Sequence, residues 1–144
     1  MKHPLLLFLF LTQPLMSHAT PCSSFARWSH GSRPLLIFSP SPSNPGVISQ
    51  RRLLAAPTAP ATLADYQIPI LDASIPYPGA PVCAQDISSL RRRFHIDPAD
   101  FTVILLGKDG GEKLRLHKPV TLKALTDLID TMPMRRQETR DGSH

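Results

Sequence analysis

Residues 101–116, FTVILLGKDGGEKLRL, decide the fold of this chain. Phe101–Leu106 is a continuous apolar run, and Glu112–Leu116 alternates polar with apolar side chains, so both segments have the patterns of β-strands. Between them, Asp109-Gly110 suits a tight turn, because glycine readily adopts the positive φ angles that such turns require. The stretch therefore predicts a β-hairpin.

Two strand–helix units are predicted before the hairpin. The first has a buried strand at Pro34–Phe38 and a helix from Asn44 through Ala56, which Pro57 and Pro60 end. A further turn of helix is expected at 61–66. The second unit has a strand within 67–75 and a helix at 84–94 with one apolar face.

A last helix is predicted after the hairpin, because Leu122, Leu125, Leu128 and Ile129 form one apolar stripe that ends near Met132-Pro133. The order strand, helix, strand, helix, hairpin, helix is that of the thioredoxin core. We therefore expect an α/β, thioredoxin-like fold. Its central mixed four-stranded sheet would combine two parallel βα units with a C-terminal β-hairpin, flanked by about three helices.

The N-terminus has the pattern of a cleavable signal peptide. Lys2 precedes the apolar run Leu5–Leu11, and Ser17-His18-Ala19 places small residues where a signal peptidase cuts, which predicts cleavage after Ala19. The run is shorter than the roughly 20 residues needed to cross a bilayer, so no transmembrane span is expected after cleavage. We expect a periplasmic or secreted protein, most naturally of a Gram-negative bacterium.

The chain of 144 residues suffices for one domain. The predicted divisions are a signal peptide at 1–19, an irregular mature N-terminus at 20–32, the thioredoxin-like domain at 33–133 and a charged, flexible tail at 134–144.

The two cysteines of the chain could form a disulfide or take part in redox chemistry. In an oxidising compartment Cys22 and Cys83 are candidates for a disulfide, which would close a loop of about 60 residues and stabilise the fold by about 4 kcal/mol in the chain-entropy model. Alternatively, Cys83 begins a predicted helix, where the helix dipole lowers a thiol pKa. The segment 39–43 after the first strand, SPSPS, lacks the CxxC pair of thioredoxins, so ordinary oxidoreductase chemistry is not expected.

The net charge of +5 comes with a pI near 9.7. The arginines lie in short groups without an interleaved aromatic stripe, so no nucleic-acid partner is predicted. Neither His95 nor His117 has a second histidine at metal-ligand spacing, and we assign no metal ligands, catalytic residues or cofactor.

One candidate anion site is predicted. If Arg33 and Lys108 converge on the loop with Ser39 and Ser41, whose backbone amides lead into a helix N-terminus, the four residues would suit an anionic ligand.

Two phrases resemble a known bacterial family. KDGG at 108–111 and MPMR at 132–135, with the surrounding residues from Phe25 to Glu138, resemble the domain of unknown function 4174 (DUF4174). The matching motif residues are Trp28, Lys108, Asp109, Gly110, Gly111, Asp130, Met132, Pro133, Met134 and Arg135. The resemblance implies a thioredoxin-like fold in exported bacterial proteins, a kinship with repeats of some animal extracellular-matrix proteins, and no established activity.

Three functions remain open from the sequence. The first is a non-catalytic binding or interaction module of the envelope, with an envelope protein or an anionic ligand as partner. The second is a thiol-dependent redox accessory protein or enzyme using Cys83 with Cys22. The third is a protein held electrostatically on an anionic envelope surface. For 132–135, the alternatives are helix-end packing on the core or an interaction surface. The sequence predicts no oligomeric state.

Overall fold

A computed structural model describes residue 25 and residues 31–74 and 84–142. In chain order the elements are β1 (Leu35–Phe38), α2 (Pro45–Leu54), α3 (Ala59–Asp65), β2 (Ile70–Asp72), α4 (Ala84–Arg93), β3 (Thr102–Leu106), β4 (Glu112–Leu116), α5 (Leu122–Asp130) and α6 (Pro133–Asp141). The predicted signal peptide and most of the predicted mature N-terminus, including Ala19, Cys22 and Trp28, lie outside the described residues, as does Cys83.

The four strands form one open mixed sheet in the order β2-β1-β3-β4. β1 runs parallel to β2 and antiparallel to β3, and β3 runs antiparallel to β4. This arrangement confirms the predicted α/β fold with a mixed four-stranded sheet and is consistent with a thioredoxin-like core.

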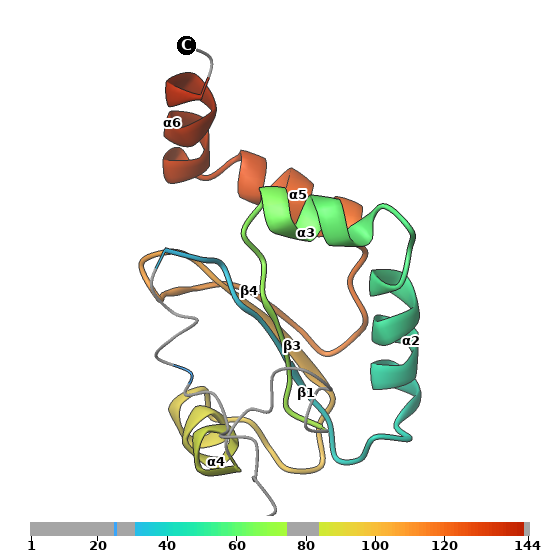
Figure 1. The fold of residues 1–144 in the computed structure, drawn as a ribbon. Coiled ribbons are helices and arrows are strands. Elements are labelled where there is room, and N and C mark those ends of the chain that lie inside the picture. The colour runs from blue at the N-terminus through green and yellow to red at the C-terminus, as the bar shows by residue number, and fades with distance from the viewer. Residues whose placement is uncertain (1–24, 26–30, 75–83, 143–144) are drawn as a thin grey trace, which may run out of the picture.

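Helices cover both faces of the sheet (Figure 1). Because strand side chains alternate between faces, Leu36 and Phe38 of β1 pack with Leu90 of α4 and with Phe94, which directly follows that helix. Leu35 faces the other way, where the strands pack against α5 and the region of α3. Every residue of β1 and β3 is buried, so the sheet centre is apolar on both sides.

The predicted hairpin is confirmed. Its turn is closed by the Gly107 amide, which donates to the Gly111 carbonyl at 2.8 Å, and by the Gly110 amide, which donates to the Gly107 carbonyl at 2.9 Å. Gly110 has a φ of +74°, the left-handed conformation that favours glycine. The register shifts between Leu105 and Leu106, which increases the twist of the hairpin beside the turn.

A buried polar side chain helps to fix α2 on the body. Gln50 is fully buried, and its amide group donates to the Val120 carbonyl at 2.9 Å and accepts from the Val120 amide at 2.8 Å. Both backbone groups of Val120 are thus satisfied inside the protein. Gly46, on the same helix, lies so close to the Phe101 ring that a Cβ there would approach it to 2.6 Å.

Two helices differ from the sequence prediction. The helix predicted from Asn44 ends before Pro57 as expected, but the further turn predicted at 61–66 is a helix that already begins at Ala59. Pro60 falls in its first turn, where the missing N–H needs no partner. Likewise Pro133 opens α6 in the segment where only a charged tail was expected. The described residues therefore contain five helices, against about three predicted.

β2 is shorter than the segment predicted for it, because it starts only after Pro69, which has no amide hydrogen for a strand ladder. In the part of the chain that is described, none of the helices is both long enough and apolar enough to cross a bilayer.

Candidate functional site

The KDGG and MPMR phrases meet in space around one cavity of about 290 Å³, which we call the signature pocket. Its lining residues are Arg33, Gly107, Lys108, Asp109, Lys113, Met132, Pro133 and Met134. The hairpin turn forms one wall, and the start of α6 forms the other. Two segments that are separated by more than one element of the chain thus build a single site.

Glu138 of α6 joins the cations of this site. Arg33 is 1% exposed, and its Nη2 donates to Glu138 Oε1 at 2.9 Å. Lys108 Nζ lies 2.6 Å from the same oxygen. Arg33 is also held by its Nη1, which donates to the Tyr66 carbonyl at 3.2 Å. A buried arginine and a largely buried lysine therefore share one carboxylate.

This pairing sets the protonation of Glu138. Burial acts to raise the pKa of the Glu138 carboxyl, but hydrogen bonds from Lys108 and Arg33 outweigh burial and hold the pKa below its usual value. Glu138 is therefore charged at neutral pH and remains charged in mildly acidic solution.

Lys113 folds back over the hairpin turn. Its Nζ lies 2.7 Å from Asp109 Oδ2, and a Cβ at Gly107 would overlap the Lys113 side chain. The hydrogen bond from Lys113 is the main cause that lowers the pKa of Asp109. Glycine at 107 thus allows both side chains to close over the turn.

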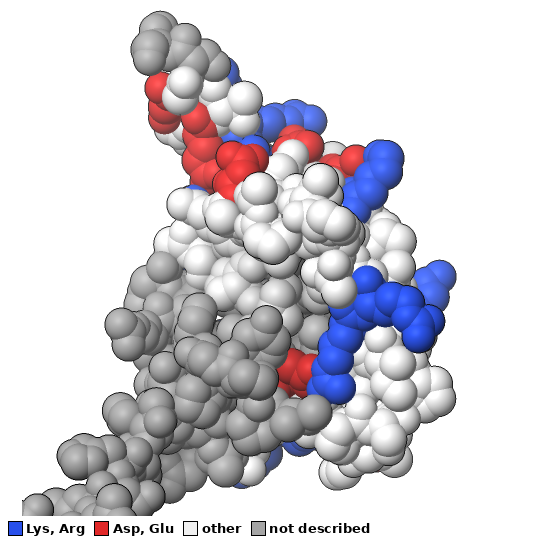
Figure 2. Space-filling view, turned by 45° about the vertical axis from the view of Figure 1, so that its right-hand side comes forward, with Lys and Arg blue, Asp and Glu red and all other residues white. Residues whose placement is uncertain are grey.

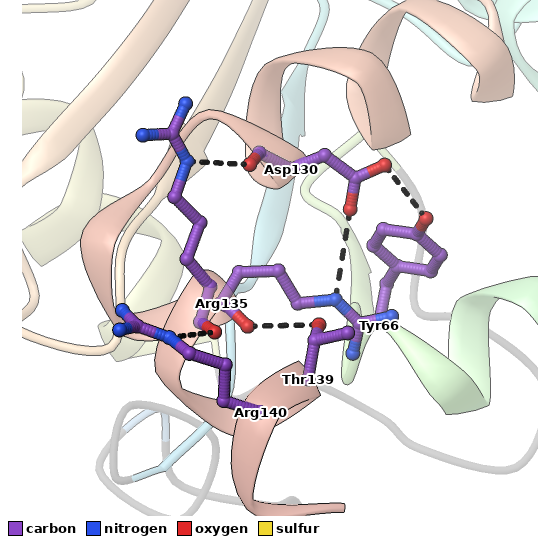
Figure 3. A pocket seen from close by; sticks show the side chains of 6 residues that line it. Tyr66, Asp130, Arg135, Thr139 and Arg140 are labelled. Atoms are coloured by element: carbon purple, nitrogen blue, oxygen red, sulfur yellow. Dashed lines mark hydrogen bonds and ion pairs between the residues drawn. The ribbon is translucent and has the colours of Figure 1, made fainter. Parts of the chain in front are cut away.

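Arg135, from the MPMR phrase, attaches the start of α6 to α3 and α5. Its Nη2 donates to Asp65 Oδ2 at 2.9 Å, and its Nε lies 3.6 Å from Asp130 Oδ1. The guanidinium stacks 4.2 Å from the centroid of the Tyr66 ring, and the Tyr66 hydroxyl donates to Asp130 at 3.0 Å (Figure 3). Arg135 is thus fixed by charge and stacking together.

Burial is the main cause that raises the pKa of Tyr66, and the bond to Asp130 adds to it. This side of α6 carries an open groove of about 640 Å³. The groove is lined by Tyr66, Asp130, Arg135, Arg136, Thr139 and Arg140. Figure 2 shows acidic and basic side chains close together at the end of the molecule that carries α6.

The predicted anion site is brought together only in part. Arg33 and Lys108 do converge, but they meet at Glu138, near the N-terminal end of β1. Ser39 and Ser41 follow the opposite end of β1, where the Ser39 hydroxyl donates to the Ser41 carbonyl at 2.7 Å. The structure therefore separates the two serines from the two cations and gives the serines a turn-forming role.

Sequence reasoning missed Glu138 as a site residue. The available signal was its position three residues after Arg135, which places both side chains on the same side of a helix. Among the residues that the structure describes, no three His, Cys, Asp or Glu side chains are grouped so as to share a metal ion.

The sheet, its two helical layers and the pocket define a small α/β domain with an open mixed sheet. Residues 24–138 match the family described as "Domain of unknown function (DUF4174)", and the chain belongs to this family.

A curated relative is the Danio rerio protein "Coiled-coil domain-containing protein 80", which is 38% identical over 58 residues. The match covers 40% of this chain and 7% of that protein. No solved structure matches the chain.

Proposed function

We propose that this protein is an exported, non-catalytic binding module of the bacterial envelope, which uses a thioredoxin-like scaffold to present the signature pocket to a partner. One observation carries the proposal. The KDGG and MPMR phrases, on which the resemblance to the family rests, meet around a single cavity, although they belong to different parts of the chain.

The exposure of the pocket wall supports binding over core packing. Met134 is 50% exposed, and α6 has no buried residue. A methionine held on the surface beside two lysines adds little to a hydrophobic core, whereas flexible methionine side chains suit a recognition surface. Met132 packs partly on the core cluster, so helix-end packing accounts for that residue but not for Met134.

The rival function is a thiol-dependent redox role for Cys83 with Cys22. A free-thiol titration of the mature protein in denaturant, before and after equilibration with a glutathione buffer, separates the two functions. The binding module predicts no change at mild potential, because the cysteines would be locked. Thiols that exchange readily in the glutathione buffer would give the redox role first place.

The binding surface itself is tested by site-specific photo-crosslinking in the bacterium that produces the protein. A photoreactive residue at position 134 is compared with one at position 48, because Met134 and Ile48 are similarly exposed, at 50% and 43%. We expect a discrete adduct from position 134 and none from position 48. Identical adduct patterns at the two positions, or no adduct at 134, would contradict the proposal.

A further inference from the structure

Resting on the proposed function, we infer that the partner is a protein that inserts an acidic side chain, flanked by apolar residues, into the signature pocket beside Lys108 and Lys113. Three features of the pocket carry this inference, namely its charge, the carboxylate that it already holds and its apolar wall.

The charge of the pocket favours an acidic group. Among the charged residues that line the pocket, three are cations, Arg33, Lys108 and Lys113, and one is a carboxylate, Asp109. Glu138 contacts Arg33 and Lys108 but also lies 3.9 Å from Arg135, so it offsets only part of this excess of positive charge. Burial in a partly enclosed site strengthens such an attraction relative to open solvent. A basic or neutral side chain would leave the excess charge uncompensated.

Lysine geometry leaves room for another carboxylate. An ammonium group has three N–H donors, and Lys108 Nζ has one described carboxylate contact, at Glu138. Lys113 is 35% exposed and pairs with an Asp109 side chain that is 55% exposed. Both lysines line the cavity, so each ammonium group can donate to an incoming oxygen while keeping its present partner.

Glu138 shows that a carboxylate borne by a protein side chain suits this site. It reaches Arg33 and Lys108 from α6, a helix that has no buried residue of its own. Its carboxylate satisfies the deepest cation, Arg33, and leaves the outer part of the pocket to the two lysines. The incoming acidic side chain would occupy that outer part.

Apolar flanking residues are required by the opposite wall. Met132, Pro133 and Met134 line the cavity together, and the exposed Met134 can adapt its side chain to a neighbour. A cavity of about 290 Å³ lies at the lower end of the range for ligand sites, so it suits one side chain with its neighbours. Charge on one wall and apolar surface on the other thus specify an acidic residue between apolar residues.

The test uses end-blocked tripeptides and the full mature protein, with binding followed by NMR chemical shifts of the residues around the pocket. The peptide Leu-Glu-Leu is compared with Leu-Gln-Leu, Gly-Glu-Gly and hexanoate. We expect Leu-Glu-Leu to bind about tenfold more tightly than either altered peptide, a ratio that one charge-assisted bond or one buried apolar contact can supply. Hexanoate should bind more weakly than Leu-Glu-Leu, because it carries an apolar group on only one side of its carboxylate.

Variants locate the binding. Lys113→Gln and Met134→Ala should each weaken Leu-Glu-Leu several-fold, and neither change touches the Glu138 pair. Lys123→Gln is the matched control, because it removes the same charge from an exposed pair on α5. It should leave the affinity unchanged.

Equal binding of Leu-Glu-Leu and Leu-Gln-Leu, tighter binding of hexanoate, or equal loss in Lys113→Gln and Lys123→Gln would overturn the inference. If one of these results is found and the photo-crosslinker at position 134 still gives a discrete adduct, the proposed function stands and only this inference fails. If position 134 gives no adduct either, the proposed function and this inference both fail.

Discussion

The last two helices that the structure describes have the same length, but one is attached by buried apolar side chains and the other by ion pairs. α5 and α6 each contain nine residues. α5 buries Leu125 and Ile129 completely, and the Thr121 hydroxyl caps its start by accepting from the Ala124 amide. α6 has no buried residue and no side-chain cap, and stands apart from the sheet (Figure 1).

The difference separates folding from recognition. Burial of α5 contributes to the core that makes the sheet stable, whereas α6 is attached through Arg135 and Glu138 at its first two turns. Ion pairs at partly exposed positions contribute little to stability and respond to pH and salt. The MPMR phrase, on which the sequence resemblance to the family partly rests, thus begins a helix that has no buried residue.

The largest effect is expected in α5. Leu125→Ala should lower the free energy of unfolding by about 2–5 kcal/mol, because it leaves a cavity in a fully buried layer. Denaturant unfolding followed by circular dichroism measures the change. Lys123→Gln, on the exposed side of the same helix, should change it by less than about 0.5 kcal/mol. Similar losses in the two variants would show that α5 is not the core element described here.

A smaller effect is expected from Arg33→Met, which removes the buried partner of Glu138 while keeping much of the side-chain volume. We expect a loss of about 1–3 kcal/mol, because the Tyr66 carbonyl and the Glu138 carboxylate lose a charged donor. Arg52→Met, at an exposed site of α2, is the control and should be nearly neutral. Amide hydrogen exchange should show the loosening in α6 and not in β3.

Acid should release α6 before the core unfolds. The pKa of Glu138 is lowered in the folded protein, so its contribution is complete above its unfolded pKa and is lost as pH falls through the lowered folded value. Hydrogen exchange of α6, measured while the pH is lowered from about 6 to about 3, should therefore accelerate earlier than exchange in the sheet. In Glu138→Gln, α6 should exchange rapidly at every pH. Parallel acceleration of α6 and sheet in the native protein would argue against this attachment.

The smallest effect is expected from Tyr66→Phe. It removes the hydroxyl that donates to Asp130 but keeps the ring under Arg135, so the loss should be about 0.5–1 kcal/mol. Thermal unfolding measures it. A loss as large as that in Leu125→Ala would mean that this side of α6 supports the core.

Local patterns predicted the elements whose partners lie close in sequence. Asp109-Gly110 is enough to place the hairpin, and the apolar stripe of α5 is enough to place that helix. The apolar run before Ser39 places β1 in the same way. In each case the short-range periodicity or turn chemistry is the physical cause of the structure.

Long-range charge pairing escaped prediction. Arg33 and Glu138 are 105 positions apart, and the sequence around either residue does not predict the other as its partner. Pro133 was interpreted as the end of a helix, because proline inside a helix breaks it. The same residue can also open a helix at its first position, and the charged residues after it did not indicate that a new helix starts there. The candidate anion site failed to assemble for the same reason, because the position of Ser39 and Ser41 relative to Lys108 depends on the strand between them.

The central claim is that α5 belongs to the core and that α6 does not. Its most direct test is truncation after Thr131, with denaturant unfolding followed by circular dichroism. The structure predicts that the shortened protein keeps a cooperative transition and loses only about 1–3 kcal/mol, because no residue of α6 is itself buried and Met132 packs only partly on the core. Loss of the cooperative transition would contradict this account and show that the MPMR segment is part of the core.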